Sequence, residues 1–242
     1  MDSPLDGRAV LVTGGGRGLG AAICEAVAAD GARVFVADVD EARAHACAKR
    51  LRADGRNAEA LRMDVTSEED IARALAHVHE TGGGLDAVVN NAAIDVTLPI
   101  DELPSRDWDR VLATNLRGPF LVARQAVSYM RPRGRGHIVN IASTASKRAW
   151  PNASAYHATK WGLLGLSHAL HAELRPLGIK VTAVIAGGMK TPFLLDRFPD
   201  IDVATLQDPA NVARAVHFAL SMPAESVIAE IMVLPMRETS WP

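Results

Sequence analysis

Cysteine and net charge are both scarce in this sequence. Two cysteines, Cys24 and Cys47, occur among 242 residues, and both fall in stretches with helical patterning. Two isolated cysteines do not make the disulfide framework of a small secreted protein, so we expect buried thiols in a reducing compartment. The formal net charge of -2 offers no basic surface to nucleic acid or to an anionic membrane, so neither partner is expected.

Long apolar runs are also missing. No segment approaches the roughly 20 consecutive apolar residues that a membrane-spanning helix needs. The stretch from Met1 to Arg8 lacks the apolar segment of a signal peptide. We therefore expect a cytoplasmic protein.

Short runs rich in β-branched residues alternate with alanine-rich stretches along the chain. This alternation predicts an α/β fold whose parallel sheet is covered by helices on both faces, and right-handed crossovers make that sheet doubly wound. The predicted strands are Arg8–Thr13, Arg33–Asp38, Ala58–Asp64, Ala87–Asn90, His137–Ala142, Lys180–Ile185 and Val227–Leu234. The predicted helices are Leu19–Asp30, Glu41–Asp54, Ser67–His79, Ser105–Asn115, Phe120–Arg131, Ser154–Leu174 and Pro209–Met222.

A glycine-rich segment, Thr13-Gly-Gly-Gly-Arg-Gly-Leu-Gly20, joins the first predicted strand to the first helix. Glycines there allow a tight turn and let backbone N–H groups approach a pyrophosphate at the helix N-terminus, which indicates a Rossmann-type domain. Asp38 ends the second strand, where a carboxylate binds ribose hydroxyls and repels a 2′-phosphate, so NAD is favoured over NADP. Arg17 has three readings: it holds a 2′-phosphate, which would favour NADP, or it serves the pyrophosphate, or it points to solvent.

Tyr156 and Lys160 form the second conspicuous feature. The chain has only two tyrosines, and four residues separate this one from the lysine, with Ser143 thirteen residues upstream of Tyr156. Residues four apart share a helix face, so the ammonium of Lys160 can lie close to the phenol. A nearby positive charge lowers the pKa of a phenol and makes it a usable proton donor and acceptor.

Together these motifs resemble those of the short-chain dehydrogenase/reductase family, from Arg8 to about Leu234. The family's Thr-Gly-x-x-x-Gly-x-Gly loop is matched at Thr13, Gly14, Gly18 and Gly20. Further matches are Asp64-Val65, Asn90-Asn91-Ala92-Ala93, Asn115, the strand ending in Ser143, and Ala186-Gly187-Gly188-Met189-Lys190-Thr191. The sequence departs from the family at Ala93, at Ala186, and in a tail over residues 235–242 that lacks Asp-Gly-Gly.

The resemblance implies hydride transfer between nicotinamide and a carbon that bears oxygen. It makes Tyr156 the general acid/base, Lys160 the group that lowers the Tyr156 pKa and binds the nicotinamide ribose, and Ser143 the stabiliser of the substrate oxygen. Asn115 would hold a water that links Lys160 to solvent. The implied catalytic residues are Ser143, Tyr156, Lys160 and Asn115. The implied cofactor-binding residues are Gly14, Arg17, Gly18, Leu19, Gly20, Asp38, Asp64, Val65, Asn91, Tyr156, Lys160, Met189 and Thr191.

The leading prediction is therefore an NAD-dependent oxidoreductase formed by a single domain over residues 1–242. One alternative is an NADPH-dependent ketone or 3-oxoacyl reductase. Another is a non-catalytic dinucleotide-binding module that senses redox state, although the tyrosine, lysine and serine are all present. His168 and His171 share a helix face but lack a third ligand at a recognisable spacing, so no metal is expected.

The substrate pocket is expected where the loops after the fourth, fifth and sixth strands meet. Candidate lining residues are Ile94, Val96, Ala145, Trp150, Met189, Phe193 and Leu194. Most are apolar and no arginine cluster accompanies them, so the sequence predicts an uncharged, hydrophobic secondary alcohol or ketone. The substrate loop is placed near residues 187–207, and Asp95 and Asp101 are interpreted as turn or cap residues.

Two long helices suggest self-association. The alanine-rich helices Phe120–Arg131 and Ser154–Leu174 resemble those that form four-helix interfaces in the family, which implies a homotetramer or homodimer. Trp241 near the end of the chain has no obvious partner in the sequence, and docking on a neighbouring subunit or pocket is one reading of it.

Overall fold

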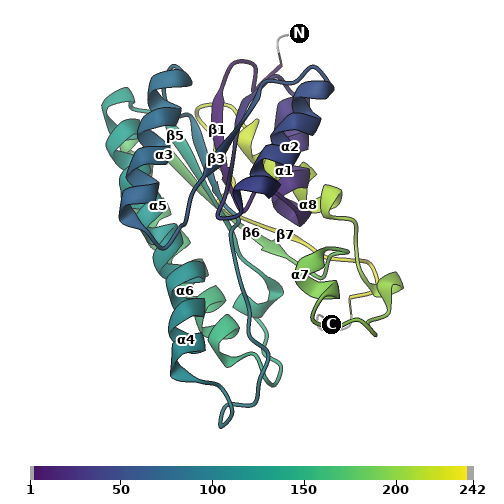
Figure 1. Ribbon diagram of the computed structural model, residues 1–242. Coiled ribbons are helices and arrows are strands. Elements are labelled where there is room, and N and C mark those ends of the chain that lie inside the picture. The colour runs from purple at the N-terminus through teal and green to yellow at the C-terminus, as the bar shows by residue number, and fades with distance from the viewer. Residues whose placement is uncertain (1–2, 239–242) are drawn as a thin grey trace.

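Seven parallel strands form one sheet at the centre of the molecule (Figure 1). A computed structural model describes residues 3–238, so the predictions for Trp241 and the end of the tail lie outside the described residues. The strand order is β3-β2-β1-β4-β5-β6-β7, and every pairing is parallel. The strands are β1 (Ala9–Thr13), β2 (Arg33–Asp38), β3 (Ala58–Arg62), β4 (Ala87–Asn90), β5 (Gly136–Ile141), β6 (Ile179–Ala186) and β7 (Glu230–Val233).

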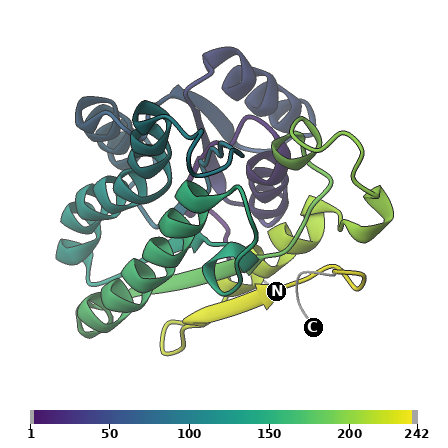
Figure 2. The same cartoon turned by 90° about the horizontal axis from the view of Figure 1, so that it is seen from below.

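Helices cover both faces of this sheet, as the sequence predicted (Figures 1 and 2). Alternate residues of β1 point to opposite faces, so Val10 and Val12 belong to one apolar cluster, and Ala9 and Leu11 to the other. Helices α1, α2 and α8 cover the first face. Helices α3 and α5 cover the second face, and Leu174 at the end of α6 packs into the same cluster. The helices are α1 (Gly18–Ala29), α2 (Glu41–Ala53), α3 (Glu68–Thr81), α4 (Ser105–Leu112), α5 (Gly118–Met130), α6 (Ser154–Leu174), α7 (Pro192–Leu195) and α8 (Pro209–Leu220). The single-domain Rossmann-type prediction is confirmed.

The predicted helix Ser105–Asn115 is wrong at its C-terminal end. Helix α4 stops at Leu112 and continues as one π-helical turn over Ala113–Arg117, which leads directly into α5. The π-turn coincides with a tertiary contact, since the side chain of Asn115 in this turn is hydrogen-bonded to the backbone of Ile94. A π-turn widens a helix locally and often marks a functional position.

Smaller differences occur at other element ends. The last strand runs over Glu230–Val233 and is shorter than predicted, and a short helix, α7, follows the sixth strand. Cys24 and Cys47 are buried free thiols, as predicted. No helix in the described part of the chain combines the length and the apolar character that crossing a bilayer requires.

Candidate active site

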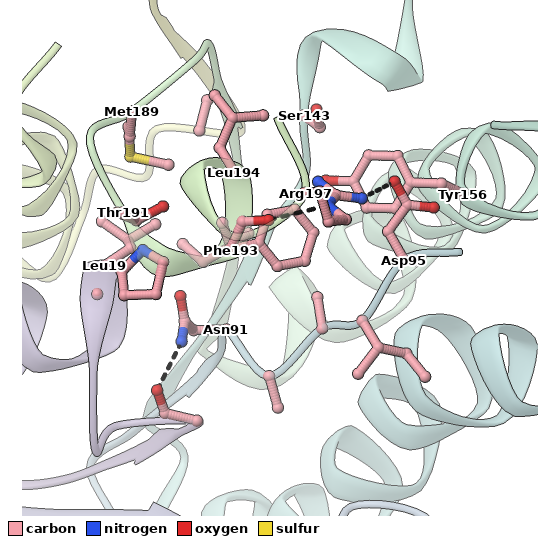
Figure 3. Close-up of a pocket in the computed structure, with 18 of the residues that line it drawn as sticks. Leu19, Asn91, Asp95, Ser143, Tyr156, Met189, Thr191, Phe193, Leu194 and Arg197 are labelled. Carbon is pink, nitrogen blue, oxygen red and sulfur yellow. Dashed lines mark hydrogen bonds and ion pairs between the residues drawn. The ribbon is translucent and has the colours of Figure 1, made fainter. Parts of the chain in front are cut away.

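A cavity of about 950 Å³ opens at the carboxyl ends of the strands (Figure 3). It begins at the glycine-rich segment after β1 and extends past the ends of β2, β4, β5 and β6. Nearly every residue predicted to bind cofactor or to react lines it. Those that do are Gly14, Arg17, Gly18, Leu19, Asp38, Asp64, Val65, Asn91, Ser143, Tyr156, Lys160, Met189 and Thr191. Gly20 and Asn115 do not line the cavity.

The glycine-rich segment has the backbone that a phosphate-binding turn requires. Gly14 and Gly18 have φ values of 61° and 55°, a region that side chains other than glycine rarely adopt. A Cβ on Gly20 would lie 2.1 Å from the carbonyl oxygen of Gly14, so Gly20 permits the close packing of α1 under the loop. Helix α1 has no side-chain cap at Arg17, which leaves its first N–H groups available to an anion.

Asp38 is held at the end of β2 by two backbone hydrogen bonds. Its Oδ2 accepts from the N–H of Gly16 and its Oδ1 from the N–H of Asp40, both at 3.0 Å. The buried Asp38 lines the same end of the cavity as the glycine-rich segment. Arg43, which the sequence analysis missed, lines the cavity beside it and pairs with Asp40 at 2.9 Å.

The ends of β1 and β4 are joined through Thr13 and Asn91. The Thr13 hydroxyl oxygen accepts from the N–H groups of Asn91 and Ala92 at 3.0 and 3.1 Å. The Asn91 amide donates to the carbonyl oxygens of Thr13 and Gly14 at 3.0 and 3.1 Å. These bonds fix the glycine turn against the neighbouring strand.

Ser143, Tyr156 and Lys160 meet on one wall of the cavity. Ser143 follows β5, and its hydroxyl accepts from the N–H of Ala145 at 3.2 Å. Tyr156 and Lys160 lie in the first turns of α6, on one face as the spacing predicted. The Lys160 ammonium donates to the carbonyl oxygen of Ile141 at 2.8 Å and lies 5.5 Å from the centroid of the Tyr156 ring.

The electrostatics of this wall differ from the sequence prediction. Burial raises the pKa of Tyr156 to about 12, and the opposing influences are a hydrogen bond with Ser143 and the charge of Arg197. Burial also lowers the pKa of Lys160 to about 8. The low Tyr156 pKa that the sequence predicted is therefore not found in the chain alone, where burial raises the pKa of this phenol.

Asn115 lies behind the cavity wall. Its Oδ1 accepts from the N–H of Ile94 at 2.9 Å, and its Nδ2 donates to the carbonyl oxygen of Ile94 at 2.7 Å. The same amide is 3.3 Å from the hydroxyl of Thr159 on α6. Asn115 thus joins the π-turn, the loop after β4 and the helix that carries Tyr156.

The reading of Asp95 as a turn or cap residue is wrong. Its side chain lines the substrate end of the cavity, is only 5% exposed, and forms an ion pair with Arg197, 102 residues further along the chain. Burial raises the pKa of the Asp95 carboxyl against the lowering effect of Arg197. No local sequence pattern indicates this pair, since neither residue belongs to a motif.

Most of the apolar residues predicted for the substrate pocket line the same cavity. Five of the expected residues line it: Ile94, Trp150, Met189, Phe193 and Leu194. Val96 and Ala145 do not, and Ala145 is fully buried behind the wall. Glu238, from the tail, also lines the cavity, and its carboxylate accepts from the N–H of Gly188 at 3.1 Å.

The fold and this cavity define an α/β oxidoreductase of the Rossmann type. The model of the short chain dehydrogenase family matches residues 8–202. Cyclopentanol dehydrogenase of a Comamonas species is 33% identical over 94% of this chain and 95% of its own length. The chain belongs to the short-chain dehydrogenase family.

Two solved structures show the same fold with different cofactors. A metagenomic short-chain oxidoreductase in complex with NADP is 31% identical and has a TM-score of 0.86, with 97% of this chain and 99% of that one covered. The 3-ketoacyl-(acyl-carrier-protein) reductase of Brucella melitensis, complexed with NADH, is 30% identical and has a TM-score of 0.88, with 96% and 99% covered. The family therefore uses both nicotinamide dinucleotides.

Proposed function

We propose that this protein is an NAD-dependent oxidoreductase that transfers hydride between nicotinamide and an uncharged secondary alcohol or ketone. The observation that carries the proposal is one continuous cavity, lined at one end by the glycine turn and Asp38 and further along by Ser143, Tyr156 and Lys160. The dinucleotide, when bound, supplies the hydride acceptor or donor. The glycine turn, the uncapped start of α1 and the buried Asp38 carboxylate fit such a group.

The chain's own residues then handle the proton and the substrate oxygen. In the oxidation direction, Tyr156 as phenolate takes the hydroxyl proton of the alcohol, and in reduction the phenol donates that proton to the ketone oxygen. Ser143 orients the substrate oxygen by hydrogen bonding. Lys160 supplies a fixed positive charge at the same wall and a donor for the ribose. Asn115 acts as a positioning residue, through its two bonds to Ile94. Residues 187–207 form the substrate loop over this end.

The preference for NAD rests on Asp38. This buried carboxylate lines the cavity at the end of β2, where it would repel a 2′-phosphate and accept hydrogen bonds from ribose hydroxyls. Arg17 is paired with Asp196 at 3.5 Å and Arg43 with Asp40 at 2.9 Å, so both nearby arginines already have acidic partners. The same two arginines support the second candidate, an NADPH-dependent ketone or 3-oxoacyl reductase.

The proposal also includes self-association and a cytoplasmic location. Phe120 on α5 and Trp161 on α6 are exposed large side chains on the helices that resemble the family's interfaces, which supports a homotetramer or homodimer. The thiols of Cys24 and Cys47 are unpaired and buried, which supports a cytoplasmic location. A redox sensor without activity remains the alternative from another class, and turnover distinguishes it.

The test is a panel of secondary alcohols and ketones with NAD(H) and NADP(H), followed by the absorbance of the reduced nicotinamide. We expect higher kcat/KM with NAD, and a loss of kcat of at least about a thousandfold in Tyr156→Phe with NADH binding retained. Tyr129→Phe, at the only other tyrosine, is the matched control. Near-normal turnover by Tyr156→Phe would show that Tyr156 is not the proton donor.

A further inference from the structure

The substrate end of the cavity contains a charged pair that the proposed proton transfer does not use. Asp95, on the loop after β4, and Arg197, just beyond α7, face one another beside Tyr156 (Figure 3). Their side chains are 5% and 21% exposed. Apolar residues of similar volume often stabilise a protein as well as a buried ion pair does, so stability alone does not account for this one.

Arg197 is held rigidly but keeps free hydrogen-bond donors. Its Nε–H donates to the carbonyl oxygen of Phe193 at 2.9 Å, and one Nη1–H donates to Asp95. Its guanidinium lies 4.3 Å from the centroid of the Phe193 ring and 5.4 Å from that of Phe198. A guanidinium has five N–H groups, so among the described residues those on Nη2 have no hydrogen-bond partner. They belong to a side chain that lines the cavity.

Asp95 has an unused hydrogen-bond acceptor. Its Oδ2 pairs with Arg197, whereas its Oδ1 is buried without a hydrogen-bond partner in the part of the chain that the structure describes. A buried carboxylate oxygen without a donor costs free energy, which a suitable ligand group recovers. The pair therefore offers one ligand both a donor and an acceptor at neighbouring positions.

The opposite charges of Asp95 and Arg197 limit the class of ligand that the pair can bind. The carboxylate cancels the charge of the guanidinium, so the pair attracts neither an anion nor a cation strongly. A hydroxyl both donates and accepts, so it satisfies an Arg197 N–H and the Asp95 carboxylate together. The neighbouring side chains of Ile94, Trp150 and Leu194 offer apolar contact to the carbon skeleton.

Building on the proposed alcohol and ketone chemistry at Tyr156, we infer that Asp95 and Arg197 bind a second hydroxyl of the substrate. The substrate class is then an uncharged secondary alcohol with a further hydroxyl on a nearby carbon, or the corresponding hydroxy ketone. Both side chains lie beside Tyr156 in the same cavity (Figure 3), next to the residue that the proposed function places at the reacting oxygen. Such a site discriminates strongly against a substrate that lacks the hydroxyl, since the pair then stays partly unsatisfied.

The first experiment uses the wild-type protein and substrates matched in skeleton. Initial rates with the proposed cofactor are compared for 2,3-butanediol and 2-butanol, for 1,2-cyclohexanediol and cyclohexanol, and for 3-hydroxybutanoate as a charged analogue. We expect kcat/KM to favour at least one diol over its mono-alcohol by about tenfold or more, the value of a hydrogen bond to a charged group. Equal values for both pairs, or a preference for the hydroxy acid, would overturn the inference.

The second experiment removes the pair without leaving a lone buried charge. In the double variant Asp95→Asn/Arg197→Met, the KM for the diol should rise and its advantage over the mono-alcohol should fall about tenfold. The control carries the same substitutions at exposed positions, Asp101→Asn/Arg106→Met, and should keep the wild-type ratio. A pair that only fastened the loop after α7 would lower the rates of both substrates equally and leave the ratio unchanged, which would contradict substrate binding.

The two proposals fail in different ways. Turnover of mono-alcohols without any preference for diols overturns the role of Asp95 and Arg197 and leaves the proposed function intact. Absence of turnover for every alcohol and ketone, with NADH binding retained, overturns the proposed function and this inference with it. The wild-type comparison decides the matter even where the double variant does not fold.

Discussion

The Lys160 ammonium donates a hydrogen bond to the carbonyl oxygen of Ile141, with 2.8 Å between the two atoms. This contact connects α6 to the last residue of β5 and aims the ammonium along the cavity wall that also carries Ser143. Burial lowers the pKa of Lys160 to about 8, so the folded protein holds this charge at a cost. A cost of that kind is expected where a positive charge serves chemistry rather than stability.

Replacing this lysine should separate activity from stability. We expect Lys160→Met to lower kcat by about a hundredfold or more, because a positive charge beside the phenol is lost. The free energy of unfolding should not fall, because the substitution removes a desolvated charge and keeps most of the side-chain volume. Steady-state kinetics and urea unfolding give the two readouts, with exposed Lys49→Met as the control. A large loss of stability with normal kcat would show that Lys160 serves stability and not catalysis.

A buried histidine predicts how stability changes with pH. His137 on β5 is 2.7 Å from the Thr182 hydroxyl, and burial lowers its pKa to about 3, whereas an unfolded histidine titrates near 6.5. Between these values the unfolded chain binds a proton that the folded chain does not. Stability is therefore lost as the pH falls through about 6.5 toward 3, by about 1.4 kcal/mol per pH unit for this one group.

The comparison that isolates this contribution uses His137→Gln, which keeps a hydrogen-bonding group near Thr182 but does not titrate. Urea unfolding of both proteins at pH 7, 6 and 5 should give a shallower decline for the variant. Parallel declines would mean that other groups account for the acid sensitivity.

Removing the Asp38 carboxylate should change cofactor choice. In Asp38→Ser the repulsion of a 2′-phosphate is gone, and Arg43 on the same side of the cavity can contact that phosphate. We expect the ratio of kcat/KM for NAD over NADP to fall by about tenfold or more. The exposed Asp54→Ser, at the end of α2, should leave the ratio unchanged. An unchanged ratio in the Asp38 variant would indicate that other residues select the cofactor.

Asn115 should contribute to both stability and rate. Asn115→Leu has a similar volume but leaves the N–H and the carbonyl oxygen of Ile94 without their partner. We expect a loss of about 1–3 kcal/mol in the free energy of unfolding, together with a lower kcat. Thermal and urea unfolding with steady-state kinetics test this, and Asn57→Leu at an exposed position is the control. Unchanged stability would mean that Ile94 finds other partners.

The features that sequence predicted are those encoded locally. The sheet follows from the alternation of β-branched and alanine-rich runs, and the glycine turn from residues that are adjacent in the chain. The Tyr156–Lys160 spacing placed both residues on one face of α6, because helical periodicity depends on nothing else.

The features that sequence missed depend on distant contacts. Asp95 and Arg197 lie 102 residues apart, and no local pattern brings them together. The π-turn is associated with hydrogen bonds between Asn115 and Ile94, which helix propensity does not encode. The pKa of Tyr156 depends on burial, and the spacing of two residues reports proximity but says nothing of desolvation.

The π-turn at Ala113–Arg117 also determines how the side-chain faces of α5 are rotated relative to those of α4. A regular α-helix turns by about 100° per residue, so the wide turn shifts the faces of α5 relative to those of α4. Loss of one residue here would let both helices join as a single regular rod. The amide of Asn115 would then rotate away from Ile94, and the loop that carries Asp95 would lose one of the contacts that hold it. One extra residue in a helix thus sets the position of a loop that is distant in sequence and central to the pocket.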